Sequence, residues 1–178
     1  MPAPVIRFTS GTAFPSSVYL DTNLLLYARD VLSTKYRIAS TCLAALIRQR
    51  SELNLSALVI DEFWWGLLRA SHRALSGREL TAQEYKRDKS IWRETWPRID
   101  EITTELLRWA RVRLVTAASA SDLTAEARTL MRTNPLAPRD AFHLAMALQN
   151  NLRAFVTADA DFEGLELPAG REIAIIKF

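Results

Sequence analysis

Short apolar runs alternate with longer segments of helical periodicity along most of the chain. In the longer segments, apolar residues recur every three or four positions, which predicts helices near 34–50, 57–71, 81–96, 98–111, 122–132 and 139–150. The short runs have the length of strands and lie at 18–20, 52–55, 113–116, 154–157 and 173–176. This alternation predicts an α/β fold with a central, mostly parallel sheet and helices on both faces.

The stretch 18–27, VYLDTNLLLY, sets a single carboxylate between two apolar segments. Burying an ionised carboxylate is costly unless it is paired, hydrogen-bonded or bound to a cation. Asp21 follows a predicted strand directly, and open α/β sheets bind ligands at the carboxyl ends of their strands. Asp21 is therefore a candidate ligand-binding residue, although the same position also suits a helix N-cap.

Three further positions place acids in similar settings. Asp159 and Asp161 follow the strand predicted at 154–157, and Glu62 lies on the inward side of an apolar helix. Asp140 opens the helix that follows the rigid segment NPLAP, where a favourable interaction with the helix dipole is the alternative explanation. In a parallel sheet Asp21 and Asp159 leave at the same edge, and we expect adjacent helices to bring Glu62 and Asp140 there.

Carboxylates that converge without a lysine or arginine beside them repel one another unless a divalent cation neutralises them. Oxygen ligands select Mg²⁺ or Mn²⁺ rather than zinc, and one cysteine with two distant histidines cannot build a zinc site. A carboxylate-held ion of this kind activates water and stabilises charge in displacement at phosphorus. The predicted substrate is therefore a phosphate ester.

Positive charge is concentrated in the middle of the chain. Residues 69–113 carry 11 basic and 7 acidic groups (+4), against +1 for 1–68 and −2 for 114–178. A basic segment beside an acidic site suits a nucleic acid, although a solvated helical face is the more common meaning of such a pattern. We expect the helix-borne pair Trp64 and Trp65 to be core or dimer contacts rather than a base-stacking platform.

Composition places the chain among ordinary globular proteins. It has 178 residues, of which 49% are hydrophobic, and we expect a single domain over 1–178 with a flexible lead-in at 1–16. The single cysteine, Cys42, suits a reducing compartment. No apolar run approaches the ~18 residues that span a bilayer, and the first residues do not resemble a signal peptide, so we expect a cytoplasmic protein without a membrane contact.

Four motifs, in this order, resemble a PIN domain of the VapC toxin type. They are LDTN at 20–23, SALVIDE at 56–62, RDAFHLAMA at 139–147 and VTADADF at 156–162. The resemblance covers roughly residues 18–176. It implies a five-stranded parallel sheet, a Mg²⁺- or Mn²⁺-dependent endoribonuclease, and a small antitoxin protein that blocks the site.

Carried onto this sequence, the resemblance makes Asp21, Glu62, Asp140 and Asp159 the metal-binding and catalytic acids. Asn23 and Thr157 become polar neighbours that order a carboxylate or a water. Asp161 ranks below Asp159, because the family's Asp-Phe pair has a more structural role. We expect His143 to be a packed, hydrogen-bonded residue rather than a general base.

The chain departs from compact relatives between Glu62 and Asp140, where about 76–111 read as an inserted helical hairpin. We expect Lys86, Arg87 and Lys89 of this insertion, together with Arg139, to contact RNA, and the five tryptophans make a homodimer plausible. The alternatives that stay open are a PIN scaffold that binds RNA or protein without cutting, a nuclease of RNA maturation, and a DNA nuclease. A phosphatase is disfavoured because the position of its second acid holds Asn23.

Overall fold

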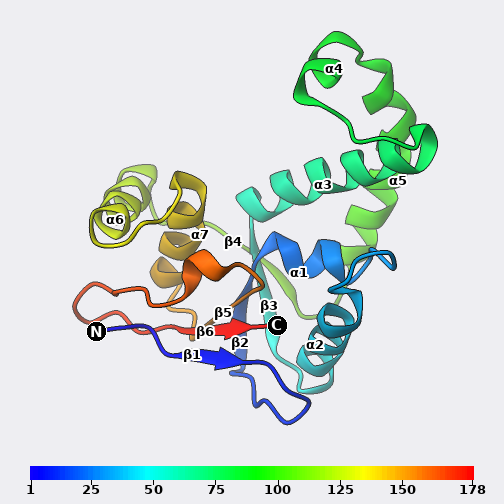
Figure 1. Cartoon of the computed structure of the whole chain (residues 1–178). Coiled ribbons are helices and arrows are strands. Elements are labelled where there is room, and N and C mark those ends of the chain that lie inside the picture. The colour runs from blue at the N-terminus through cyan, green and yellow to red at the C-terminus, as the bar shows by residue number, and fades with distance from the viewer.

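A computed structural model describes residues 1–178, which form one parallel sheet between helices (Figure 1). The six strands have the order β1-β6-β5-β2-β3-β4, and every neighbouring pair is parallel. The strands are β1 (Val5–Arg7), β2 (Ser17–Leu20), β3 (Glu52–Ser56), β4 (Val112–Val115), β5 (Ala154–Thr157) and β6 (Ala174–Lys177). The helices are α1 (Thr22–Tyr27), α2 (Tyr36–Arg48), α3 (Ala57–Ser76), α4 (Ala82–Arg87), α5 (Ser90–Leu107), α6 (Ala120–Thr133) and α7 (Pro138–Gln149), with a 3₁₀ turn at Ala160–Phe162.

The sequence-based prediction of an α/β fold with a parallel sheet is confirmed, but the number of strands was wrong. Five strands were expected and six are present, because Val5–Arg7 pairs in parallel with β6 at the sheet edge. This segment belongs to residues 1–16, which were expected to be a flexible lead-in. All three strand residues are exposed, so no alternation of buried and exposed positions marked the strand in the sequence.

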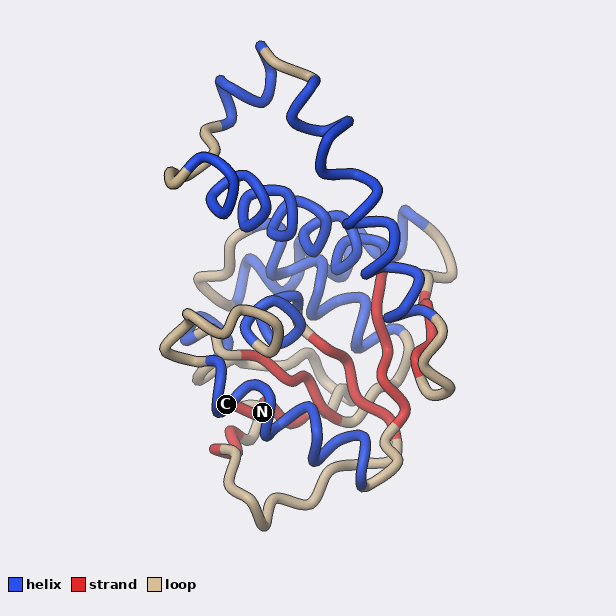
Figure 2. The backbone as a smooth tube through the Cα atoms, turned by 90° about the vertical axis from the view of Figure 1, so that its right-hand side faces the viewer, coloured by secondary structure: helices blue, strands red, loops and turns tan.

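Strands β2 and β5 lie side by side at the centre of the sheet and are almost wholly buried. From β2 the chain proceeds to β3 and β4 on one side, and β5, β6 and β1 lie on the other side. Helices cover both faces of the sheet, with α6 and α7 on one side and α1 and α2 on the other (Figures 1 and 2). None of the helices is both long enough and apolar enough to cross a membrane.

Helices α3, α4 and α5 form an arm that extends away from the sheet, with α4 at its far end (Figure 1). Gly66 in α3 faces α1 so closely that an added Cβ would lie 2.5 Å from the Leu26 side chain. The missing side chain therefore lets α3 pack closely against α1, while the start of α3 is set by strand β3, whose last residue, Ser56, is its N-cap. The left-handed Gly77, with φ 73°, ends α3.

The arm corrects the expected hairpin at 76–111. Its two long members are α3 and α5, and the break lies at Asp88 rather than at Pro97, which is inside α5. Asp88 has an extended backbone, and its carboxylate accepts a hydrogen bond from the Ser90 amide (2.9 Å), which starts α5 there. Pro97 is on the exposed face, where water can solvate the carbonyl that its missing amide leaves unpaired.

Candidate active site

The candidate site lies where β2 and β5 end. Leu20 pairs with Val156, so Asp21 and the segment from Thr157 to Asp159 leave the sheet at the same edge. The chain connections run in opposite directions from these two neighbouring strands, and such switch points in parallel sheets leave a crevice that binds ligands. Helix α7 brings Asp140 to this edge in its first turn, and α3 brings Glu62.

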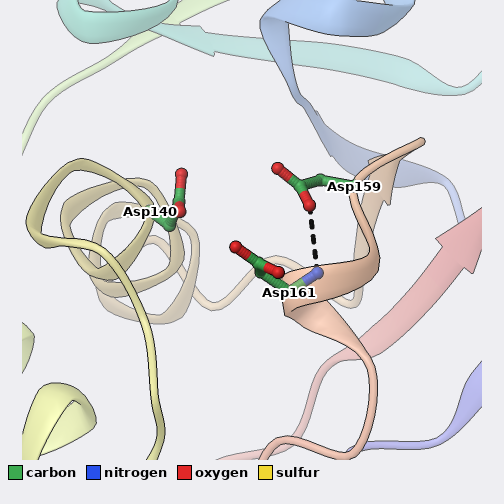
Figure 3. Close-up of side chains that lie close together, drawn as sticks. All are labelled: Asp140, Asp159 and Asp161. Atoms are coloured by element: carbon green, nitrogen blue, oxygen red, sulfur yellow. Dashed lines mark hydrogen bonds between the residues drawn. The ribbon is translucent and has the colours of Figure 1, made fainter.

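Three carboxylates meet at this edge: those of Asp140, Asp159 and Asp161 (Figure 3). One oxygen from each lies within 4.8 Å of the others. The 3₁₀ turn after β5 holds two of them, because Asp159 Oδ1 accepts a hydrogen bond from the Asp161 amide (3.0 Å). Asp161, which the sequence ranked below Asp159, therefore stands in the same cluster, and neither Asp21 nor Glu62 is a member of it.

Negative charge dominates the cluster, although Lys177 lies within the electrostatic reach of Asp159 and Lys35 Nζ lies 3.5 Å from the Ala158 carbonyl oxygen. Partial burial, followed by the charges of Asp159 and Asp21, raises the pKa of Asp140 to about 6. The influence of Asp21 shows that its carboxylate acts on the cluster although it is not part of it. Asp140 and Asp159 are half-buried and Asp161 is exposed, so a ligand from solvent can reach the carboxylates.

Asp21 is held by two polar neighbours. Its Oδ2 accepts hydrogen bonds from the Thr157 hydroxyl (2.5 Å) and from the Asn23 amide. Asn23 in turn accepts a hydrogen bond from the Ala158 amide (3.1 Å), which ties α1 to the end of β5. Burial raises the pKa of Asp21, and the Thr157 hydrogen bond partly opposes this rise.

Glu62 lies among groups that can donate hydrogen bonds. Its Oε1 is 3.3 Å from Arg139 Nε, and its Oε2 is 3.2 Å from His143 Nε2 and accepts a hydrogen bond from Thr22 (2.7 Å). Burial would raise the pKa of Glu62, but the adjacent His143 imidazole and the hydrogen bond from Thr22 outweigh it and leave the pKa lowered. Arg139 therefore stands beside Glu62, so Glu62 is not one of a group of acids without a basic neighbour.

A buried chain of hydrogen bonds runs from Ser56 through Tyr19 to His143, whose ring lies against Glu62. The Tyr19 hydroxyl lies 2.6 Å from Ser56 Oγ and 2.9 Å from His143 Nδ1. With a proton on Nε2 facing Glu62, His143 accepts from Tyr19 through Nδ1. His143 is 2% exposed, as expected for a packed histidine.

Sequence reasoning missed Tyr19 and Thr22. Tyr19 is an isolated phenol at the end of a buried strand and needs a hydrogen-bond partner, which is the signal that could have identified it. Thr22 follows Asp21 directly in the LDTN motif, where its hydroxyl gave no separate signal. Both act on Glu62 through contacts between segments that are distant in the chain.

The residues Lys86, Arg87 and Lys89 are all exposed at the far end of the arm, and we call them the basic tip. Lys89 Nζ lies 4.0 Å from the centre of the Tyr85 ring. Arg139, expected to contact RNA with them, is instead at the base of the arm, and it lies 3.7 Å from Asp61 as well as beside Glu62. The four residues expected to contact RNA therefore lie in two places, with three at the basic tip and Arg139 beside the candidate active site.

The donor atoms fit a hard divalent cation. The cluster offers carboxylate oxygens alone, which suit Mg²⁺ or Mn²⁺, and it has no thiolate or imidazole that would favour zinc. Burial, followed by the like charges of Asp159 and Asp21, raises the pKa of Asp140, and a bound cation would oppose this rise by stabilising the ionised carboxylate.

Three comparisons relate the chain to known proteins. A comparison with curated proteins finds no match. Among solved structures, the chain is similar to VapC20 of Mycobacterium tuberculosis, described as a sarcin-ricin loop cleaving toxin, with 14% identity and a TM-score of 0.51 over 82% of this chain and 92% of that one. This likeness shows a shared fold.

Two further structures have TM-scores of 0.49 and cover 82% of this chain. One is VapBC2 of Rickettsia felis bound to a promoter DNA fragment, with 17% identity over 90% of its chain, and the other is FitAcB of Neisseria gonorrhoeae, with 18% identity over 89%. The family model described as the PIN domain matches residues 18–166. Since this match spans most of the sequence and the sheet edge carries the acids described above, the chain belongs to the PIN-domain family.

Proposed function

We propose that the protein is a Mg²⁺- or Mn²⁺-dependent endoribonuclease and the toxin of a toxin–antitoxin pair. The observation that carries the nuclease assignment is the cluster of Asp140, Asp159 and Asp161 at the switch point of the sheet, with Asp21 acting on it electrostatically. PIN-domain membership and the VapC-like motifs support this assignment.

Asp21, Asp140 and Asp159, together with Asp161, would hold the ion, which when bound lowers the pKa of a coordinated water and stabilises charge on a phosphate. Asn23 and Thr157 both donate hydrogen bonds to the same oxygen of Asp21, Oδ2, and so fix the orientation of its carboxylate. Glu62 remains ionised at neutral pH, because its hydrogen bonds stabilise the carboxylate. It would accept a hydrogen bond from a water or a substrate hydroxyl and orient it.

A nucleic acid is the favoured phosphate ester because of the basic tip. An exposed cluster of lysine and arginine attracts a long polyanion, and a small metabolite would not reach both the tip and the cluster. RNA is preferred over DNA on the resemblance to VapC toxins. The same resemblance suggests a small antitoxin as partner. The single cysteine favours a cytoplasmic location, and the five tryptophans favour a homodimer.

Cleavage assays test the nuclease proposal. The native chain should cut structured RNA in Mg²⁺ or Mn²⁺ but not in chelator, and Asp21→Asn or Asp140→Asn should remove cutting. Asp100→Asn, an exposed acid on α5, is the matched control and should cut normally. Metal-independent cutting, or cutting that survives both site substitutions, would refute the assignment, and RNA binding without cutting would favour the scaffold alternative.

The toxin role is tested separately. Expression of the native chain should arrest growth, while the Asp140→Asn chain should not. Co-expression of the product of an adjacent short reading frame should restore growth. Cleavage in vitro without growth arrest would favour a nuclease of RNA maturation, and preferential cutting of single-stranded DNA would overturn the choice of RNA.

A further inference from the structure

We propose that a cavity between the arm and the start of α7 binds one unstacked base of the RNA substrate. The cavity has a volume of about 350 Å³ and is lined by Trp64, Trp65, Tyr85, Trp92, Asp61 and Arg139. Helices α3, α4, α5 and α7 each contribute to its wall. The proposal rests on the proposed function only for the identity of the nucleic acid.

The aromatic wall is held in place by packing beneath it. Trp64 donates a hydrogen bond to Thr103 (2.9 Å) and meets Trp96 edge to face at 5.5 Å between ring centres. Trp96 also stacks on Trp92, with ring centres 4.8 Å apart. The wall therefore costs little conformational entropy on binding, and flat rings fixed in advance are what a stacking site for a nucleobase requires.

The contribution of Trp65 differs from what the sequence suggested. Trp65 meets Tyr85 of α4 edge to face at 5.3 Å, and both side chains are only half-buried. A helix-borne pair of tryptophans was expected to be core or a dimer contact. Both tryptophans line the cavity, and Trp64 is in addition anchored by its hydrogen bond to Thr103.

The charged groups of the wall favour a base over an apolar peptide. Asp61 offers a hydrogen-bond acceptor and Arg139 offers donors, and both side chains are more than half exposed (68% and 56%). The edge of a nucleobase carries hydrogen-bond donors and acceptors side by side. Asp61 and Arg139 can therefore hydrogen-bond to the edge of one base. A cavity of this volume is at the small end of ligand pockets, which suits a single ring system rather than a helix of a partner protein.

Position connects the cavity to the candidate active site. Arg139 is part of the cavity wall and lies 3.3 Å from Glu62, while the next residue, Asp140, belongs to the carboxylate cluster. Lys89 lies over Tyr85 at the other end, so positive charge lies beyond the aromatic wall. An RNA chain with one phosphate at the carboxylate cluster can therefore place a neighbouring base among the tryptophans. Its sugar-phosphate backbone can then continue towards the basic tip.

The test measures binding without cleavage. Short single-stranded RNAs of mixed sequence are titrated in chelator against native chain, Trp65→Ala, Trp92→Ala and the milder Trp92→Phe. Trp109→Ala is the matched control, since Trp109 is also half-buried but lines a different cavity. We expect each alanine variant of the wall to weaken binding about 5- to 100-fold, the phenylalanine variant to retain most of the affinity, and the control to bind normally.

A scan of RNAs that each lack one base identifies the bound base. At one position, removing the base should weaken RNA binding by the native chain about as much as the alanine substitutions do. The same abasic RNA should bind the Trp92→Ala chain no more weakly than the intact RNA does. Equal RNA affinity in native and wall variants would overturn the base site while leaving the nuclease proposal intact. Normal RNA binding with loss of antitoxin binding would also overturn it, in favour of protein docking. If the native chain binds no RNA at all, the RNA assignment itself fails.

Discussion

Removing the charge of Asp140 should stabilise the protein when no metal is bound. Asp140 stands in a cluster with Asp159 and Asp161, and partial burial and the neighbouring acids raise its pKa to about 6. In the unfolded chain its pKa is near 3.8. Keeping Asp140 ionised at pH 7 therefore destabilises the folded state, and Asp140→Asn removes this destabilisation.

The size of the effect follows from the pKa. A shift from 3.8 to about 6 corresponds to at most about 3 kcal/mol, since one pKa unit is about 1.4 kcal/mol. Solvent around a half-buried carboxylate screens its charge, which reduces this to roughly 1.5 kcal/mol. Loss of the favourable interaction with the α7 N-terminus removes about 0.5 kcal/mol. The net gain of about 1 kcal/mol should raise Tm by about 2–4 °C in a domain of this size.

The gain depends on pH with a defined sign. Because the folded pKa is raised, the folded state binds more protons between about pH 4 and 6, and stability falls as pH rises through this range. The destabilisation is thus complete above about pH 7 and absent below about pH 4. Asp140→Asn should gain stability at pH 7.5 and gain none near pH 4.

Thermal unfolding in chelator and in Mg²⁺ measures these effects. Mg²⁺ should raise the Tm of the native chain but not that of the Asp140→Asn chain. The native chain should therefore have the higher Tm in Mg²⁺ and the lower Tm in chelator. Asp100→Asn is the control and should follow the native chain in both media. If Asp140→Asn lowers Tm in chelator at pH 7.5, or if both chains respond equally to Mg²⁺, the account of charge repulsion relieved by a cation is wrong.

Three further results are expected. Reversing all three charges of the basic tip to glutamate should weaken RNA binding and lower the slope of log affinity against log salt by about 2, measured by filter binding; an unchanged slope would mean that the tip does not contact phosphates. His143→Ala should lower the free energy of unfolding by about 2–4 kcal/mol in urea titrations, because it leaves a cavity and unpaired partners beside Glu62; a loss below 1 kcal/mol would argue against the hydrogen-bond chain. The stabilisation of native chain by Mg²⁺ should decline as pH falls through about 6, where Asp140 takes up a proton, and an effect of equal size at pH 5 would exclude Asp140 as a ligand.

The sequence determined the layered fold and the sheet edge that carries the acids. Strand β5 agrees with its predicted bounds and β2 agrees within one residue, because these buried parallel strands read as apolar runs. Strand β3, whose sequence ELNLS alternates polar and apolar residues, also agrees within one residue. A carboxylate that follows such an apolar run, as at Asp21 and Asp159, indicates the carboxyl edge of the sheet from the sequence alone. Polar residues inside apolar segments are costly, and that cost makes them visible in the sequence.

The tertiary structure alone decided which groups touch. Exposed β1 exists only through its pairing with β6, and no local pattern indicates such a pairing. The clustering of Asp161 depends on a 3₁₀ turn, and the contacts of Glu62 with Arg139 and His143 depend on how α3 and α7 approach each other. Likewise, the aromatic cavity forms from four helices. Periodicity records whether a residue is buried, whereas its neighbours are set by packing between segments far apart in the chain.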